Sequence, residues 1–296
     1  MEIHTPELRQ RSVTAGGVDF SLLECGPEDG QLVICLHGFP DCAWTWRHLL
    51  PVLGASGYHA IAPFLRGYAP SGLAPDGSYQ TGALAADACA LDELLGASVP
   101  SVLVGHDWGA FAAYGAARSN PDRFTKVVAM AAPPVAALAS TFFSYDQVKR
   151  SFYVFLFQSP LAEALVGADD CNFIARLWAD WSPGYDASWD VARVKESIGA
   201  PERLSAAIAY YRAMLDTSTH LDTYSREQQA ALGVPPQPTL YFHGQDDGCI
   251  GVEAVSDVLA LLPVGSEAVV VAGAGHFLHL EQPAEVHADL LRFISS

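Results

Sequence analysis

Residues 105–109, GHDWG, place a carboxylate between two glycines, after an apolar run and directly before the alanine-rich segment 110–119. The pattern predicts a sharp turn from a strand into a helix with Asp107 at its tip, because Gly105 and Gly109 leave room for close approach. Such a turn lifts its central side chain above the carboxyl edge of a sheet, where ligands bind in open α/β folds. Asp107 then either caps the helix or is an ionised nucleophile, favoured by the helix dipole.

Two later segments contain the partners that a nucleophile needs, namely a base and a group that orients the base. Asp246 and Asp247 follow the apolar run 239–244, and His276 follows the run 267–273. The order nucleophile, acid, histidine is that of the triad in α/β-hydrolases. We prefer Asp247 as the acid, and Asp246 stays as the alternative.

The apolar run before residues 37–40, HGFP, ends in a second turn. The backbone N–H groups of Phe39 and Trp108 are candidates for an oxyanion hole, although an ordinary strand-ending turn explains the segment as well. A cis bond before Pro40 would turn the chain there. We expect His106 and Phe39 to line the substrate pocket.

A carboxylate nucleophile suits an sp3 carbon that carries a leaving group, because attack on an ester would give a reactive anhydride. Attack at sp3 carbon makes an alkyl ester of Asp107, which is covalent catalysis in two steps. Water activated by His276, itself oriented by Asp247, would then hydrolyse the ester.

The groups above must be positioned by strands that alternate with helices, which indicates a mostly parallel sheet with helices on both faces. The predicted strands are 18–24, 31–38, 58–64, 101–105, 124–132, 239–244 and 267–273. The predicted helices are 42–57 (broken near Pro51), 81–97, 110–119, 252–262 and 283–295. Residues 133–235 lack buried-strand runs and are predicted to form a helical lid inserted between core segments 1–132 and 236–296.

The chain of 296 residues has 16 basic and 33 acidic side chains, a formal charge of −17. Such a surface repels nucleic acids and anionic membranes and favours a neutral substrate. The N-terminal residues lack an apolar leader, and no run of about 18 apolar residues predicts a membrane span. Six scattered cysteines are typical of a reduced, cytoplasmic protein. We expect no metal and no cofactor, and a homodimer is one candidate assembly.

Five segments together resemble the epoxide hydrolase family of α/β-hydrolases: 37–47, 66–72, 105–110, 244–247 and 275–286. The resemblance implies an eight-stranded, mostly parallel sheet with a helical lid, and conversion of a small, neutral, apolar epoxide and water into a vicinal diol. It also implies two lid tyrosines that bind and protonate the epoxide oxygen. Tyr153 matches the first motif, Y-x-x-x-F-Q, and Tyr211, followed by Arg, matches the second.

Four further alternatives remain open at this point. Tyr210 is the second choice for the latter tyrosine, and Trp181 either contacts the substrate or packs the lid. A haloalkane dehalogenase would use the same nucleophile, with the lid tryptophans Trp178, Trp181 and Trp189 as halide donors. Phe39 argues against it, because it stands where a well-known form has asparagine. A non-catalytic ligand-binding protein would have no need of the complete triad.

Overall fold

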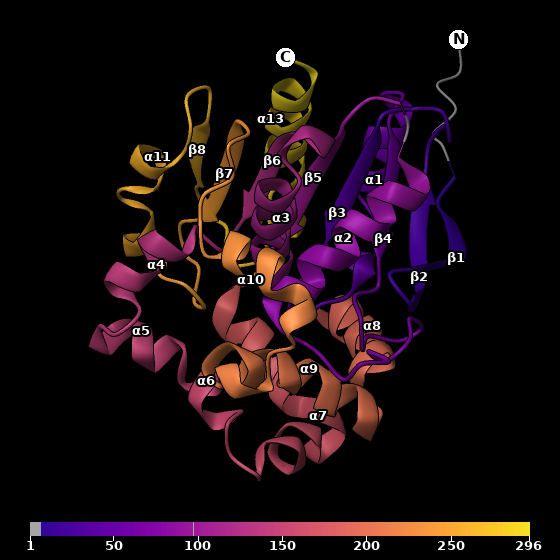
Figure 1. Ribbon diagram of the computed structural model, residues 1–296. Coiled ribbons are helices and arrows are strands. Elements are labelled where there is room, and N and C mark those ends of the chain that lie inside the picture. Colours follow the sequence, from indigo (N-terminus) through magenta and orange to yellow (C-terminus); the bar gives the residue numbers. More distant parts are fainter. Residues whose placement is uncertain (1–6, 97) are drawn as a thin grey trace.

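The computed structural model describes residues 7–96 and 98–296, whose strands form one eight-stranded sheet (Figure 1). The strand order is β1-β2-β4-β3-β5-β6-β7-β8. Strands β1 and β2 and strands β2 and β4 pair antiparallel, and all later neighbours pair parallel. The predicted fold, an α/β-hydrolase sheet of eight mostly parallel strands, is therefore confirmed.

Seven of the strands lie within or close to the predicted ranges. Their bounds are β2 Val18–Cys25, β3 Leu32–Leu36, β4 His59–Pro63, β5 Ser101–His106, β6 Phe124–Met130, β7 Thr239–Gly244 and β8 Glu267–Val271. Strand β1, Arg9–Ala15, was not predicted as a range. Its sequence, RQRSVTA, is polar because the strand lies at the sheet edge and is largely exposed, whereas β3 and β5 are buried throughout and apolar.

Helices cover the sheet in two groups. Helices α2 (Thr81–Leu95), α3 (Trp108–Ser119) and α10 (Ser225–Ala231) pack against one another, in front of the strands in Figure 1. Helix α1 (Leu49–Ala55) packs against α13 (Pro283–Ser295). These helices hold the parallel strands in a buried layer and leave the carboxyl ends of the strands facing the lid.

Two predicted core helices are divided in the structure. The range 42–57 contains a 3-10 turn, Ala43–Trp46, and then α1. The break precedes Pro51, which sits in the first turn of α1, where a missing N–H removes no helical hydrogen bond. The range 252–262 likewise holds a 3-10 turn, Val252–Val255, and α11, Val258–Leu261. Residue 97 of the predicted helix 81–97 lies outside the described residues.

The inserted segment is helical, as the absence of buried-strand runs predicted (Figure 1). Its helices are α4 Val135–Thr141, α5 Tyr145–Arg150, α6 Phe152–Leu156, α7 Ala162–Trp181, α8 Ser188–Ile198 and α9 Pro201–Leu215. Helix α10 falls inside the range 133–235 but packs on α2 and α3 of the core. By its packing, α10 lies with the core helices, although it falls inside the range predicted to form the lid.

Side chains fasten the lid to the core. The indole N–H of Trp178 donates to the carbonyl of Pro40 at 2.8 Å. Arg47 forms an ion pair of 2.5 Å with the buried carboxylate of Asp190, and its guanidinium lies 4.3 Å from the ring centre of Trp189. Within the described residues, no helix has both the length and the apolar character needed to cross a membrane.

Candidate active site

The turn between β5 and α3 has the geometry that its glycines predicted. Asp107 has φ 52° and ψ −119°, a conformation that costs free energy for a residue with a side chain. A Cβ atom on Gly105 would lie 2.2 Å from the carbonyl oxygen of Gly109, and one on Gly109 would lie 2.0 Å from that of Leu36. Only glycine fits these contacts. The Asp107 side chain makes no capping hydrogen bond, so the capping interpretation is wrong.

Backbone amides hold one oxygen of the Asp107 carboxylate. The N–H of Phe39 donates to Asp107 Oδ1 at 2.8 Å, and the Phe39–Pro40 peptide bond is cis, as expected from the turn. Burial raises the pKa of Asp107, and His276 and the amides of Phe39 and Trp108 partly offset that effect. The amides of Phe39 and Trp108, predicted as oxyanion-hole donors, thus both lie at the Asp107 carboxylate.

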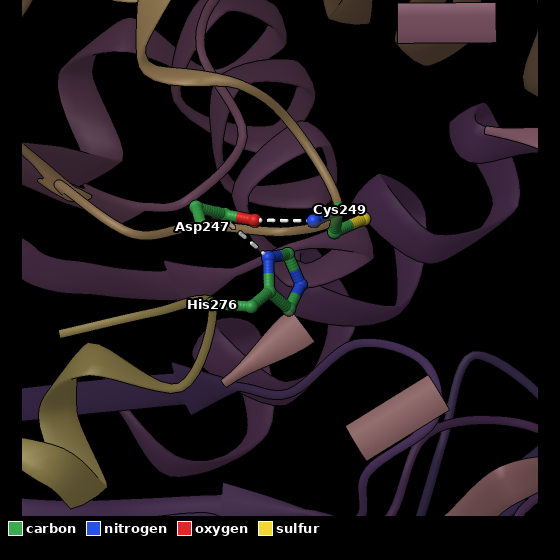
Figure 2. Close-up of side chains that lie close together, drawn as sticks. All are labelled: Asp247, Cys249 and His276. Atoms are coloured by element: carbon green, nitrogen blue, oxygen red, sulfur yellow. Dashed lines mark hydrogen bonds and ion pairs between the residues drawn. The ribbon is translucent and has the colours of Figure 1, made fainter. Parts of the chain in front are cut away.

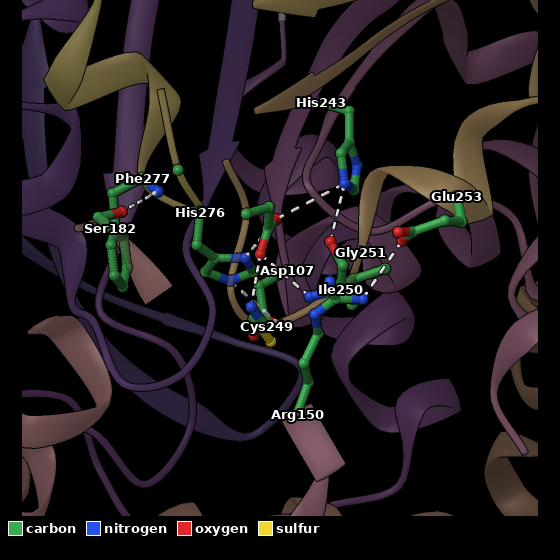
Figure 3. A network of polar contacts seen from close by, with 12 residues as sticks. Asp107, Arg150, Ser182, His243, Cys249, Ile250, Gly251, Glu253, His276 and Phe277 are labelled. Carbon is green, nitrogen blue, oxygen red and sulfur yellow. Dashed lines mark hydrogen bonds and ion pairs between the residues drawn. The ribbon is translucent and has the colours of Figure 1, made fainter. Parts of the chain in front are cut away.

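A histidine and a second carboxylate complete a chain of polar contacts (Figures 2 and 3). His276 Nδ1 lies 2.9 Å from Asp247 Oδ2, and Asp247 Oδ1 accepts hydrogen bonds from the amides of Cys249 and Ile250 at 2.7 and 3.0 Å. Asp246 is exposed. The structure therefore selects Asp247 over Asp246 as the partner of His276.

The other ring nitrogen of His276 faces Asp107. Nε2 lies 3.8 Å from Asp107 Oδ2 and has no hydrogen-bond partner among the described residues. This separation exceeds a hydrogen bond, so Nε2 is available to a reactant between the two groups. Burial lowers the pKa of His276, but the carboxylates of Asp247 and Asp107 outweigh it, and the net shift is upward.

Both predicted lid tyrosines are buried above this carboxylate. The Tyr211 ring centre lies 5.3 Å from that of Phe39 and 5.1 Å from that of Trp108, and Tyr153 packs 5.4 Å from Tyr211. Burial raises the pKa of both phenols well above the ordinary value. The Tyr211 hydroxyl has no hydrogen-bond partner within the described part of the chain. The hydroxyl of Tyr153 lies 3.3 Å from the Cys249 thiol.

Tyr210 does not share this environment. Its hydroxyl donates to the carbonyl of Arg66 at 2.7 Å. The phenol therefore has a structural partner in the core and does not line the cavity at Asp107. Of the two adjacent tyrosines, Tyr211 is the one that the fold turns toward the carboxylate.

These groups surround a small space, here termed the inner cavity, of about 40 Å³. It is lined by Asp107, Trp108, Phe111, Leu138, Phe142, Gln147, Ser151, Tyr153, Val154, Tyr211, Met214 and Ile250. Mostly apolar side chains, with Gln147 and Ser151 as the further polar groups, thus surround one carboxylate and two phenols, and such surroundings strengthen electrostatic interactions.

The three residues expected to contact substrate, His106, Trp181 and Phe39, are absent from the lining of the inner cavity, and the fully buried Phe39 reaches the site through its backbone amide. His106 Nε2 lies 2.9 Å from the backbone carbonyl of His276, and the His106 ring packs behind that histidine and against His279. It is fully buried and does not line the inner cavity, so that expectation is wrong: the neighbour of a turn's tip residue points back into the core. Trp181 packs 5.0 Å from both His276 and Tyr153 and supports them from the side.

The structure adds neighbours that sequence reasoning missed. Gln147 on α5 donates to the carbonyl of Cys249 at 2.8 Å and accepts from the amide of Gly251 at 3.0 Å. It ties the lid to the loop that carries Asp247. His243 lies behind that loop, 2.9 Å from the carbonyl of Ile250, in the network of Figure 3. Gln147 and Cys249 are 102 positions apart in the sequence, and no spacing or motif links two such distant residues. The sequence therefore pointed to the loop that carries Asp247 but not to Gln147.

Asp247, Cys249 and His276 also have the donor types of a metal site, with their ligand atoms within 4.8 Å of one another (Figure 2). His276 Nδ1 is directed at Asp247 Oδ2 at hydrogen-bond distance. The hydrogen-bonded pair accounts for the close approach without an ion.

Known proteins with similar sequences include α/β-hydrolases named as epoxide hydrolases. A family model described as alpha/beta hydrolase fold matches residues 31–283. The chain is 31% identical to an epoxide hydrolase of Caballeronia sordidicola, over 98% of this chain and 94% of that protein. It is 28% identical to Epoxide hydrolase A of Mycobacterium tuberculosis, over 97% of each chain.

Solved structures agree in fold. The crystal structure of Epoxide Hydrolase A from Mycobacterium thermoresistibile superposes with a TM-score of 0.81 at 26% identity, covering 98% of this chain and 99% of that one. The Bacillus megaterium epoxide hydrolase, crystallised with an inhibitor, gives a TM-score of 0.80 at 25% identity, covering 97% of this chain and 100% of that one.

Proposed function

The chain belongs to the epoxide hydrolase family of α/β-hydrolases, and on that premise we propose that it converts an epoxide and water into a vicinal diol. One observation carries the proposal. Asp107 has one oxygen on the Phe39 amide and the other 3.8 Å from His276 Nε2, beneath two buried phenols. That arrangement fits an Asp nucleophile, a histidine base and an acid pair for the leaving oxygen.

In the first step, Asp107 Oδ2 attacks an epoxide carbon and the ring C–O bond breaks. The leaving alkoxide is a poor leaving group, so hydrogen bonds and a proton from Tyr153 or Tyr211 lower the barrier. Burial supports this role, because it raises the pKa of both phenols and keeps them protonated. The product is a hydroxyalkyl ester of Asp107 and one phenolate.

In the second step, water attacks the Asp107 carboxyl carbon and His276 takes its proton. The developing oxyanion lies at Oδ1, where the amides of Phe39 and Trp108 stabilise it. The acyl–oxygen bond then breaks, and the diol leaves with the proton of the carboxylic acid. The imidazolium returns its proton to the phenolate, which restores every group.

The dehalogenase alternative has weaker support. A departing halide needs N–H donors, and the indole N–H of Trp178 is already bonded to the carbonyl of Pro40. Trp189 is 46% exposed and packs on Arg47. Phenols that donate a proton suit an alkoxide leaving group better than a halide.

Intact mass spectrometry of the His276→Gln variant tests the proposal. This variant should form the ester but hydrolyse it slowly, so exposure to mixed epoxides and haloalkanes of distinct masses should add the mass of a whole epoxide. The adduct should disappear in the double variant Asp107→Ala/His276→Gln. An adduct equal to a haloalkane less HX would instead assign the dehalogenase reaction, and an adduct that survives the Asp107 change would exclude Asp107 as nucleophile.

A further inference from the structure

A second hollow, here termed the outer groove, lies between α4, α9, α10 and the first turns of α2 and α3. Its volume is about 300 Å³. It is lined by Thr81, Trp108, Phe111, Val135, Leu138, Ala139, Phe142, Phe143, Met214, Leu215, Gln228, Ala231 and Leu232. Its lining includes exposed apolar side chains such as Phe143 and Leu232, so it offers apolar surface to a ligand.

The outer groove adjoins the inner cavity. The two spaces share five wall residues: Trp108, Phe111, Leu138, Phe142 and Met214. A molecule that reacts at Asp107 therefore meets the outer groove directly beyond this shared wall.

Size separates the roles of the two spaces. The inner cavity of about 40 Å³ has room for a few waters, and hence for little more than a three-membered ring. The outer groove of about 300 Å³ has the size of a small-molecule pocket. A substituent larger than a methyl or two exceeds the inner cavity, and the adjoining outer groove offers apolar space of sufficient size for it.

The chemistry of the outer groove limits that substituent. Thr81 and Gln228 are the polar residues among those lining it, and no Lys, Arg, His, Asp or Glu is among them. The Gln228 side-chain oxygen already accepts from the amide of Gly82 at 2.7 Å. A carboxylate at the end of a substituent would lose hydration there without gaining a cationic partner, and the net charge of −17 would repel it.

We infer that the outer groove binds an uncharged hydrocarbon substituent of the substrate, so that the substrate class is epoxides with an apolar tail and no terminal carboxylate. This inference rests on the proposed function. Each methylene that the groove buries contributes a nearly constant transfer free energy, which corresponds to about a fourfold gain in kcat/KM per methylene.

The experiment measures kcat/KM for terminal epoxides from epoxybutane to epoxydodecane, each paired with an epoxide of equal length that ends in a carboxylate. We expect a steep rise with chain length for the neutral series, and values at least about 10-fold lower for the acids. A flat neutral series, or acids that equal it, would overturn the inference while turnover of epoxybutane leaves the proposed function intact. Turnover of no epoxide at all would overturn both.

A groove variant locates the effect. Ala139→Trp on α4 fills the outer groove from an exposed position and should lower the ratio of kcat/KM between epoxydodecane and epoxybutane by at least about 30-fold. The matched control is Ala136→Trp, also exposed on α4 but outside the lining of both spaces. An unchanged ratio in Ala139→Trp, or an equal fall in Ala136→Trp, would place the tail elsewhere.

A charge variant tests the same site without filling it. Leu232→Arg adds a cation to the groove wall and should raise kcat/KM for the long acids by at least about 5-fold. Leu94→Arg is the control, because Leu94 and Leu232 are both 52% exposed and Leu94 lies outside the groove. Equal gains in both variants would reflect net charge alone and contradict the assignment.

Discussion

At the scale of single residues, the two lid phenols are not equivalent. The hydroxyl of Tyr153 forms a hydrogen bond of 3.3 Å with the Cys249 thiol. The hydroxyl of Tyr211 has no hydrogen-bond partner among the described residues. A thiol is a weak hydrogen-bonding group, so it holds Tyr153 in place without competing strongly for its proton. Both hydroxyls therefore remain available to an epoxide oxygen.

Replacement of either phenol by phenylalanine tests this reading. Tyr153→Phe and Tyr211→Phe should each slow epoxide opening by about 10- to 100-fold, equivalent to about 1.4–2.7 kcal/mol in the barrier. Rapid-quench measurement of ester formation checks it. Tyr210→Phe is the control: it loses only the bond to the Arg66 carbonyl and should keep the rate of ester formation. Full rates in both test variants would exclude the lid phenols as acids.

Protonation of His276 gives a second prediction. Hydrolysis of the ester needs neutral His276, and its pKa is raised because Asp247, helped by Asp107, outweighs burial. The rate should therefore fall as pH drops through a value above about 6.5. In the ester intermediate the Asp107 charge is gone, so Asp247 is the carboxylate that still raises the pKa of His276. Asp247→Asn should therefore move the acid limb of the pH–rate profile, where the rate falls with falling pH, to lower pH. Single-turnover rates of ester hydrolysis against pH measure the shift.

The exposed neighbour provides the control for this pH profile. Asp246→Asn removes one carboxylate from the same loop without contacting His276. Its acid limb should coincide with that of the unaltered protein. If both asparagine variants shift the limb equally, the charge of the loop rather than the Asp247–His276 bond sets the pKa of the base.

At the scale of elements, the turn between β5 and α3 depends on close backbone contact. Gly109 lets α3 begin against β3, since a Cβ there would lie 2.0 Å from the Leu36 carbonyl oxygen. This contact positions the strained Asp107 backbone between the two amide donors. The geometry of Asp107 is therefore a property of three adjoining elements.

Gly109→Ala should lower the free energy of unfolding by about 3 kcal/mol, because backbone atoms have to move to admit the methyl group. The urea midpoint measures it. Gly72→Ala is the control, since a Cβ on Gly72 would meet its nearest neighbour, the carbonyl oxygen of Asp19, at an ordinary 3.5 Å. Equal midpoints for the two variants would show that the turn relaxes more easily than the contact implies.

At the scale of the whole molecule, side-chain contacts attach the inserted helical segment to the core. The ion pair of Arg47 with Asp190 joins the segment before α1 to α8. The Asp190 side chain is only 2% exposed, and the hydroxyl of Tyr185 donates to it at 2.9 Å. A buried carboxylate of this kind is costly when its cation is removed.

Arg47→Ala should cost about 3 kcal/mol of stability and increase proteolytic cleavage within residues 133–215, which the urea midpoint and limited proteolysis measure. Arg292→Ala breaks an exposed ion pair with Glu267 and should leave both readouts near those of the unaltered protein, because solvent screens such pairs. A lid that stays resistant in Arg47→Ala would assign its attachment to other contacts, such as Trp178 with Pro40.

Much of the core was predictable because its signals are local. Parallel strands such as β3 and β5 are buried on both faces and so appear as apolar runs, and the glycines beside Asp107 are dictated by one turn. The sequence did not predict β1, because an exposed edge strand is polar and has no apolar run. It also did not predict the packing of α10 on α2 and α3.

The sequence by itself determined the residue types of the candidate site and their order along the chain: carboxylate, lid phenols, acid and histidine. Only the tertiary structure decided which atoms meet. It shows that Asp247, and not Asp246, contacts His276, and that the His106 ring lies behind His276. It also shows that Cys249 contacts Tyr153, which lies 96 positions earlier in the sequence. The physical reason is that local backbone preferences act over a few residues, whereas these contacts are set by how the lid packs onto the sheet.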